Sequence, residues 1–410
     1  MRILWISYIS SWTPTLLNAI KKYVEIAVII PSGGYEQFKK EDDSVIYYSL
    51  HLTAKEMKRT MNRETFHKYL KVLEQEKPSL IHVHGTETNF AQIQNFTDIP
   101  VVVSIQGILE GCIPYYNNYI REKSLKKYST VKNIFGLGGL KGVVHNFDNG
   151  TEYFEKEILT KTKFFFCRTN WDKAWVTFSN PNAVIFQGEE LLRKTFYDNA
   201  HTWNVEKCKR HSIFMPSGFN PIKGLYLAVK ALGLLKLFYD DVMLVVPGIS
   251  NDDVYMSSWK EFVFGEKYIR YIRSLIEERN LQDNIMFLGR LSAEEMVEQM
   301  QNANVFLSPS SIDNSPNAVG EATMIGTPVV TTPVGGVTSM LKDEESCLFA
   351  PAGDDHMMAF QIKRVFDNDE LACRLSYNAN FVANRRHDNI SVPKVYIDAY
   401  KTILKMKSNV

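Results

Sequence analysis

Two carboxylates, Asp313 and Glu321, have the chemistry and the spacing to hold a sugar, with seven residues between them. They belong to the segment 308–336, which reads SPSSIDNSPNAVGEATMIGTPVVTTPVGG. Ionised carboxylates accept hydrogen bonds from hydroxyl groups, and a helix that begins between the two acids would offer backbone N–H groups to an anion. The segment therefore has the outline of a site for a phosphate joined to a polyol.

The elements around these acids are predicted to be a strand, a helix and a second strand. Residues 305–307 form an apolar run that predicts a buried strand. Ser315 is the expected N-cap of the helix, with Pro316 at the first helical position and Gly326 at the end. Residues 329–332 are β-branched and predict the next strand. The helix would then begin in the crevice outside the strand ends, where open parallel sheets bind ligands.

A lysine forms the second candidate site, in the loop Ser-Gly-Phe-Asn-Pro-Ile-Lys-Gly at residues 217–224. The loop lies between a predicted strand at 213–215 and an apolar helix that begins at Leu225. A cation at a helix N-terminus opposes the helix dipole, which costs a few tenths to about one kcal/mol. Lys223 is well placed if an anion binds between its ammonium group and the helix. The alternative is a solvated loop lysine.

These residues resemble the donor-site signature of retaining GT-B glycosyltransferases of the family 4 type, the glycosyl transferases group 1. The family pattern is an acidic residue, seven others and then Glu, often with Asn-Ser-Pro-Asn after the first acid. Here the pattern is Asp313, residues 314–317 and Glu321. The first acid is more usually Glu, so Asp313 departs from the pattern by one methylene group.

The resemblance implies a role for each of these residues. Lys223, Asp313 and Glu321 would be the catalytic set: the lysine stabilises the departing nucleotide, the first acid contacts the donor sugar and the second holds the ribose. Family members often have a basic residue where this chain has Ser217. Arg290 would frame the nucleotide base through its backbone, or be a surface residue only. The expected donor-binding residues are Ser217, Gly218, Lys223, Arg290, Asn314, Ser315, Pro316, Asn317, Ala318, Val319 and Glu321.

Acceptor binding is expected in the first half of the chain, at polar residues that follow predicted strands. The candidates are His84, Glu87, Gln106, Arg168 and Asp172, and a packing role is an equal alternative for each. Many family members have a histidine near the Gln106 position, and glutamine can hydrogen-bond a hydroxyl but cannot act as a base. His82 and His84 share a strand face, but without a third ligand nearby a zinc site is not expected.

The order of elements predicts an α/β protein with two Rossmann-like domains facing each other across a cleft, the GT-B arrangement. Residues 1–200 are the expected acceptor domain, 201–390 the donor domain, and 391–410 a C-terminal helix that packs back toward the first domain. The polar stretch 198–209 is the expected linker. Strands are predicted at 3–7, 26–30, 45–48, 80–83, 101–104, 164–166, 183–186, 213–215, 243–246, 285–288, 305–307 and 329–331.

Composition limits the functional classes. The 410 residues suit two domains, and a net charge of +1 argues against bulk nucleic-acid binding. The five cysteines are scattered and odd in number, which indicates reduced cytoplasmic thiols. We expect no signal peptide and no membrane-spanning helix.

Two further motifs bear on membranes and metals. Residues 115–141 interleave basic and aromatic side chains, which suits contact with the inner face of an anionic membrane, although an ordinary solvated helix is the favoured interpretation. Asp367-Asn368-Asp369 spells a metal-binding motif of another transferase fold, but we interpret Asp369 as a helix N-cap. No metal or other cofactor is expected.

The predicted function is sugar transfer from a nucleotide-diphosphate sugar, a UDP- or GDP-sugar, to a saccharide or lipid-linked saccharide in polysaccharide or glycolipid assembly. The resemblance implies retention of configuration by front-face attack. Two alternatives stay open: a phosphorylase or epimerase on the same fold, and a sugar-nucleotide-binding partner with little activity.

Overall fold

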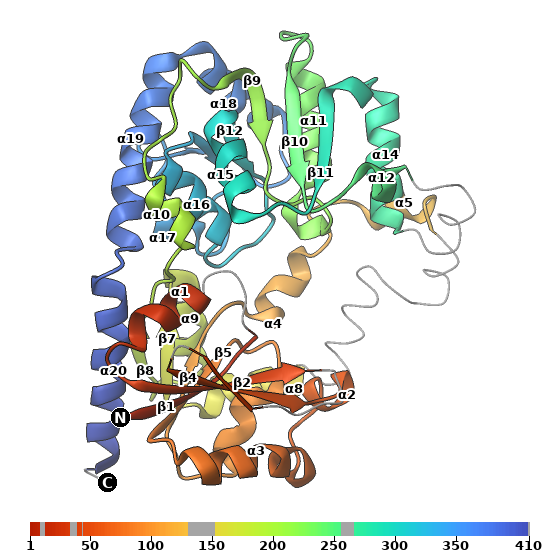
Figure 1. Cartoon of the computed structure of the whole chain (residues 1–410). Helices are drawn as coiled ribbons and strands as arrows, with labels where there is room; N and C mark the ends of the chain where they lie inside the picture. The colour runs from red at the N-terminus through yellow and green to blue at the C-terminus, as the bar shows by residue number, and fades with distance from the viewer. Residues whose placement is uncertain (9–12, 33–38, 43, 130–151, 256–265, 409–410) are drawn as a thin grey trace. The chain divides into compact units, whose positions relative to one another are not determined.

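The computed structural model describes the chain except for residues 9–12, 33–38, 43, 130–151, 256–265 and 409–410 (Figure 1). The chain divides into two compact units. Unit 1 comprises Met1–Gly111, His145–Leu191 and His387–Val410. Unit 2 comprises Cys112–Val144 and Leu192–Arg386, so it includes a segment that the sequence analysis assigned to the first domain.

Unit 1 is built on an eight-stranded sheet of order β3-β4-β2-β1-β5-β6-β7-β8. All neighbouring strands are parallel except the edge pair β3 and β4. The central strands are almost entirely apolar because helices cover both faces of the sheet. The strands are β1 (Arg2–Ile6), β2 (Glu25–Ser32), β3 (Lys39–Asp42), β4 (Val45–His51), β5 (Leu80–His84), β6 (Val101–Ser104), β7 (Phe164–Cys167) and β8 (Val184–Gln187).

The helices of unit 1 enclose two apolar clusters, one on each face of the sheet. The C-terminal helix α20 packs against α1 and β8, as Figure 1 shows with α20 in blue. Its residues Val392, Tyr396, Tyr400 and Ile403 are buried in the cluster that contains Trp5. The helices are α1 (Thr13–Ile20), α2 (Ala54–Met57), α3 (Arg63–Glu76), η1 (Asn89–Asn95), α4 (Leu109–Cys112), α8 (Glu152–Lys161), α9 (Asn170–Ser179) and α20 (Ser391–Ser408).

Unit 2 is built on a six-stranded, fully parallel sheet of order β11-β10-β9-β12-β13-β14. Its strands are β9 (Lys209–Phe214), β10 (Met243–Pro247), β11 (Ile285–Gly289), β12 (Ala303–Ser308), β13 (Val329–Thr331) and β14 (Leu348–Phe349). β9 and β12 are neighbours at the centre, so the carboxyl ends of these two strands bring together the loops that hold Lys223 and Asp313.

The helices of unit 2 surround one large apolar cluster. They are η2 (Ile113–Tyr115), α5 (Glu122–Lys126), α10 (Lys194–Asp198), η4 (Pro221–Lys223), α11 (Leu225–Leu235), α12 (Asn251–Val254), α14 (Lys267–Glu278), η5 (Gln282–Asn284), α15 (Ala293–Asn302), α16 (Asn317–Ile325), α17 (Val337–Met340), α18 (Asp355–Asp367) and α19 (Asp369–Arg386).

The expected fold class of two parallel-sheet α/β domains is confirmed, and each predicted strand has a counterpart in the structure. β3 and β14 were not predicted, because β3 is a charged edge strand and β14 has two residues. The expected linker 198–209 is instead packed within unit 2. There the backbone N–H of His201 donates to Met324 O at 2.8 Å, and the buried indole of Trp203 donates to Ala303 O at 2.7 Å.

The Asp-Asn-Asp motif lies at the junction of α18 and α19, where the capping residue differs from the expected one. The side chain of Asn368, not of Asp369, accepts the N–H of Leu371 at 2.9 Å. Asp369 pairs with Arg210 at 2.7 Å, and Asp367 pairs with Lys363 at 2.5 Å. Asparagine is as good an N-cap as aspartate, and both carboxylates have cationic partners instead.

The basic and aromatic stretch at 115–141 is described up to Ser129; Lys132 and Phe135 lie outside the described residues. In the described part, the hydroxyl groups of Tyr128 and Ser274 are 2.6 Å apart, and Arg270 donates to Tyr128 O at 3.1 Å. These contacts join the stretch to α14 of unit 2. None of the helices in the described part of the chain has the length and apolar character needed to cross a membrane.

Candidate functional site

The two predicted motifs meet in a cavity of about 230 Å³ in unit 2. It lies at the carboxyl ends of β9 and β12, beside the start of α16. The motifs are 90 residues apart in sequence, and the chain order brings them together because β9 and β12 are adjacent. The lining residues are Met215, Pro216, Ser217, Lys223, Leu307, Ser308, Pro309, Ser310, Asp313, Pro316, Asn317 and Ala318.

Lys223 and Asp313 form an ion pair at this cavity. Lys223 Nζ is 2.6 Å from Asp313 Oδ2, and the Ser310 hydroxyl donates to the same oxygen at 3.4 Å. The lysine side chain is 36% exposed and the aspartate 17%, so water reaches the pair. Ion pairs that water reaches are worth only about 0–1 kcal/mol. A ligand with an anionic group could therefore take the lysine from the aspartate.

The turn that carries Lys223 has a defined local cause. Asn220 caps the short helix η4 by accepting the N–H of Ile222 at 3.2 Å, and Pro221 begins it. Gly224 ends η4 with φ 82°, a left-handed conformation that favours glycine. A Cβ at Gly224 would lie 2.2 Å from Pro309 O, so the two loops are in direct backbone contact. This close approach holds Lys223 opposite Asp313.

The helix after Asp313 begins later than the sequence predicts. α16 begins at Asn317, Pro316 takes the N-cap position, and no side chain caps it. The hydroxyl of Ser315 instead accepts from Arg386 Nη2 at 3.0 Å, which explains why it does not cap the helix. The first N–H groups of an α-helix have no acceptor within the helix. Since Asn317 and Ala318 line the cavity, this end of α16 suits an anion. Gly326 ends the helix at φ 89°, as expected.

Glu321 lies on α16 but does not line the cavity. Its side chain is 6% exposed and accepts a two-point contact from Arg193: Nε to Oε1 at 2.7 Å and Nη2 to Oε2 at 2.8 Å. Burial raises the pKa of Glu321, and the Arg193 charge opposes that rise. The guanidinium carbon of Arg193 also lies 4.7 Å from the Phe196 ring centroid. The sequence analysis missed Arg193, although a buried carboxylate implies a cationic partner.

The other expected donor residues divide between the cavity and its supports. Ser217, Pro316, Asn317 and Ala318 line the cavity, whereas Asn314, Ser315 and Val319 are buried beneath it. A Cβ on Gly218 would meet Leu225 at 2.8 Å, so that glycine packs on α11. Arg290 is exposed after β11 and does not line the cavity.

In unit 1, His84 is the last residue of β5, and Glu87 and Gln106 follow β5 and β6 at the carboxyl edge of the sheet. Gly85 has φ 95°, and a Cβ there would lie 2.2 Å from Glu87 Oε2. This turn lets Glu87 fold back over the backbone, and burial raises the pKa of its carboxyl group. Gln106 is half-buried beside it.

His82 and His84 form a buried pair whose ring centroids are 4.1 Å apart. The ring nitrogens of His82 lie 2.7 Å from the hydroxyl groups of Tyr400 and of Ser104. Burial lowers the pKa of both rings, that of His84 to about 3, so both are neutral near pH 7. Among the residues that the structure describes, no group of three or more His, Cys, Asp or Glu side chains could hold a metal ion.

Arg168 and Asp172 have structural roles that differ from the expected acceptor contacts. Asp172 accepts the N–H groups of Arg168 and Thr169 at 2.9 and 3.0 Å, which completes the capping box of α9. The Thr-x-x-Asp spacing was the available signal for this cap. Arg168 is buried, with its Nε 3.8 Å from Glu190 Oε2.

Glu155 on α8 is a further buried acid that the sequence analysis did not single out. Its carboxylate accepts from the Thr86 hydroxyl at 3.0 Å and from the N–H groups of Leu109 and Glu110 at 2.9 and 3.0 Å. Burial raises its pKa to about 7. Glu155 therefore joins the loops after β5 and β6, which carry Glu87 and Gln106.

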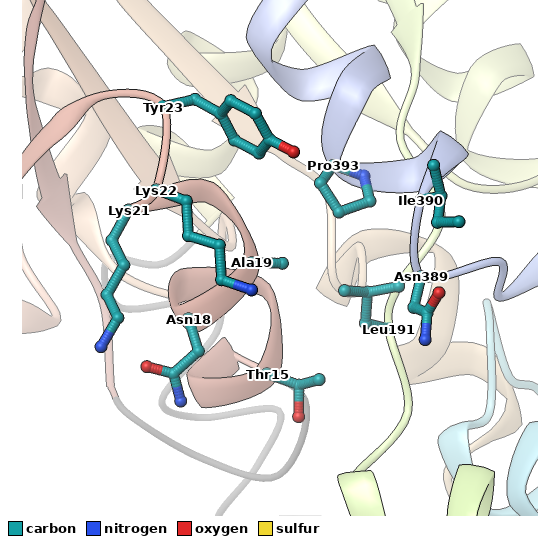
Figure 2. A pocket seen from close by; sticks show the side chains of 10 residues that line it. All are labelled: Thr15, Asn18, Ala19, Lys21, Lys22, Tyr23, Leu191, Asn389, Ile390 and Pro393. Atoms are coloured by element: carbon teal, nitrogen blue, oxygen red, sulfur yellow. The ribbon is translucent and has the colours of Figure 1, made fainter.

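A larger hollow of about 610 Å³ lies in unit 1 between α1 and the start of α20 (Figure 2). Figure 2 shows Lys22 extending into it, Lys21 turned away, and the Tyr23 hydroxyl toward Pro393. The described residues that line it include no carboxylate, no histidine and none of the predicted site residues. This hollow therefore offers less chemistry than the smaller cavity in unit 2.

Comparison with known proteins shows similarity in sequence over part of the chain and in fold over nearly all of it. Residues 200–381 match the family model of the glycosyl transferases group 1. Sucrose-phosphate synthase from Thermosynechococcus elongatus shares the fold, with a TM-score of 0.71 at 15% identity over 99% of this chain and 100% of that one. Anabaena Alr3699/HepE in complex with UDP gives a TM-score of 0.64 at 12% identity over 98% and 100%. Phosphatidyl-myo-inositol mannosyltransferase from Mycobacterium leprae is 26% identical over 262 residues, 55% of this chain and 65% of that protein.

The two parallel-sheet domains define a GT-B protein. The similarity to a glycosyl transferases group 1 domain is confined to residues 200–381, whereas the similarity of fold extends over nearly the whole chain. The chain spans just under two thirds of the length of the mannosyltransferase, so its activity, donor, acceptor and stereochemistry are matters for proposal.

Proposed function

We propose that this protein transfers a sugar from a nucleotide-diphosphate sugar to a saccharide or lipid-linked saccharide. The preferred donor is a UDP-sugar, and a GDP-sugar is the second choice. The observation that carries the proposal is the cavity where Lys223, Asp313 and the uncapped start of α16 meet. The preference for UDP is supported by structural neighbours solved with UDP and with UDP-glucose.

In the proposed donor complex, the diphosphate lies between Lys223 Nζ and the N–H groups at the start of α16. Both would stabilise the negative charge that grows on the β-phosphate as the glycosidic bond breaks. Asp313 would exchange its lysine partner for a hydroxyl group of the donor sugar. Glu321 would accept the ribose hydroxyls.

Transfer is proposed to proceed with retention by attack on the same face from which the nucleotide leaves. Asp313 is the one carboxylate among the described residues that line the cavity, so the two-carboxylate mechanism of glycosidases has no second acid there. The acceptor hydroxyl would give its proton to the departing phosphate as its oxygen bonds to the anomeric carbon. Asp313 and Glu321 would position the donor.

The acceptor is proposed to bind unit 1 at Glu87 and Gln106, with His84 and Arg168 buried behind them. A lipid-linked acceptor, as in the assembly of glycolipids or polysaccharides at the cytoplasmic face of a membrane, is supported by the similarity to a phosphatidyl-myo-inositol mannosyltransferase. The competing proposal is a sugar-nucleotide-binding protein with little turnover, which the serine at position 217 and the glutamine at position 106 favour.

Calorimetric titration with UDP, GDP, ADP and dTDP, without metal, tests the donor site. We expect micromolar binding of one nucleotide and a loss of about tenfold or more in Lys223→Ala, since charge-assisted contacts contribute about 1.5–3 kcal/mol. Lys230→Ala is the matched control, because Lys230 lies on α11 outside the cavity and pairs with Asp355 at 3.8 Å. Absence of binding with and without magnesium would overturn the donor site, and binding without turnover of any sugar nucleotide would favour the competing proposal.

A further inference from the structure

Arg193 is the buried partner of Glu321 and comes from a different element. It is the N-cap residue of α10, a helix that packs against α16. Its guanidinium group faces both carboxylate oxygens at 2.7 and 2.8 Å and lies over the Phe196 ring. The side chain is 28% exposed, whereas that of Glu321 is 6% exposed. The arginine therefore reaches the buried acid from the more open side.

The two-point contact fixes both the charge and the plane of the carboxylate. A buried acid without a cation takes up a proton, because burial disfavours the charged form. A guanidinium fork opposes this and also sets the orientation of both oxygens. An ionised carboxylate has about four acceptor positions. The guanidinium group of Arg193 occupies one acceptor position on each oxygen. One acceptor position on each oxygen is left for two neighbouring hydroxyl donors.

The elements packed against α16 carry other charged residues. They are Lys194 and Asp198 on α10, Glu294, Glu295 and Glu298 on α15, and Asp369, Glu370, Arg374, Arg385 and Arg386 on α19. Lys194 is paired with Asp198 at 2.5 Å, and Arg386 donates to Ser315 at 3.0 Å. Among the described residues, Arg193 is the one whose charge acts on the ionisation of Glu321.

We propose that Arg193 is the positioning residue for ribose recognition: it holds Glu321 ionised and oriented, so that the site distinguishes a ribonucleoside diphosphate from its 2′-deoxy form. The inference rests on the proposed function, since it assigns the ribose to Glu321. Arg193 acts through the acid and not on the sugar. It extends the donor site to a residue 128 positions away in sequence.

The test compares UDP with 2′-deoxy-UDP, titrated between pH 5.5 and 8.5 on the full-length protein. We expect the wild type to prefer UDP by about tenfold or more, since a site built to bind a hydroxyl group rejects the analogue that lacks it. Arg193→Gln should reduce that ratio toward one. As the pH is lowered, this variant should also lose UDP affinity at a higher pH than the wild type does, because Glu321 without its cation is protonated more readily. Arg193→Lys keeps the charge without the fork and should lie between the two.

Two controls separate this role from a general loss of structure. Arg210→Gln breaks a surface pair with Asp369 in the same unit and should leave the ratio unchanged. Glu321→Gln should also lose the discrimination, and Arg193→Gln in that background should reduce the ratio no further.

Each outcome decides the proposal. A wild-type preference for UDP that persists in Arg193→Gln and Arg193→Lys, with an unchanged pH profile, would overturn the role of Arg193 and leave the donor site intact. A wild type that binds UDP and 2′-deoxy-UDP equally would overturn the ribose assignment. Failure of the wild type to bind any of UDP, GDP, ADP and dTDP would instead overturn the proposed function itself.

Discussion

At the level of single residues, the charges of the proposed donor site are held in two unlike pairs. Lys223 and Asp313 meet at the cavity, where water reaches both side chains. Arg193 and Glu321 meet beneath it, where the acid is almost fully buried. Breaking a buried pair costs about 3–5 kcal/mol, whereas an exposed pair contributes about 1 kcal/mol or less. The first pair is therefore suited to exchange with a ligand and the second to permanent support.

Asp313→Asn should strengthen the binding of UDP while slowing sugar transfer. The carboxylate competes with the diphosphate for Lys223, and removing a pair worth about 0.2–1 kcal/mol should raise affinity by about 1.4- to fivefold. Calorimetry with UDP and a coupled assay of UDP release would measure both effects. Asp241→Asn, which removes a surface partner of His211, is the matched control. A weaker affinity for UDP would mean that Asp313 supports the diphosphate site and does not compete for the lysine.

At the level of the elements, the site depends on where turns and helices begin. The η4 turn is pressed against the loop after β12 at Gly224, and the start of α16 lacks a side-chain cap. The turn is set by local backbone geometry, because a glycine permits the left-handed conformation. The start of α16 is set by a contact distant in sequence, because Ser315 is engaged by Arg386. Together they fix the distance between the lysine and the helix start.

Gly224→Ala should lower both stability and UDP affinity, and Gly248→Ala should lower stability alone. Both glycines have positive φ, 82° and 80°. An added Cβ at Gly224 would lie 2.2 Å from Pro309 O, whereas at Gly248 it would meet nothing within 4 Å. Strain alone costs about 1–2 kcal/mol, and the clash should also displace Lys223. Urea unfolding of both variants measures the loss of stability, and UDP titration of both variants measures the change in affinity. Equal UDP affinity in the two variants would contradict it.

The elements were predictable to the extent that their signals are local. Apolar runs located the strands of both sheets, and Gly326 marked the end of α16. The start of that helix was misplaced because Ser315 is drawn away by Arg386, a contact 71 positions distant. Arg193 and Glu155 were missed for the same reason: their partners lie in other elements, and sequence spacing carries no signal for such contacts.

At the level of the whole molecule, the chain does not divide into halves in sequence order. The segment that begins at Cys112 belongs to unit 2, although the chain returns to unit 1 before entering unit 2 again at Leu192. Asn118 in this segment is fully buried, and its Nδ2 lies 3.2 to 3.3 Å from Pro221 O, Ile222 O and Pro309 O. The segment thus joins the two loops that hold Lys223 and Asp313. No local pattern indicated this role.

Asn118→Ala should weaken UDP binding by about tenfold, although Asn118 does not line the cavity. The substitution removes the Asn118 donor to Pro309 O, whereas Pro221 O and Ile222 O still accept the N–H groups of Gly224 and Ser311. The lost contact costs about 1–3 kcal/mol and frees the turn that carries Lys223. Asn117→Ala, at a neighbouring half-buried position, is the matched control. If Asn118 acts through the lysine, adding Asn118→Ala to Lys223→Ala should cost little further affinity. Fully additive losses would instead show that the segment supports the cavity independently of Lys223.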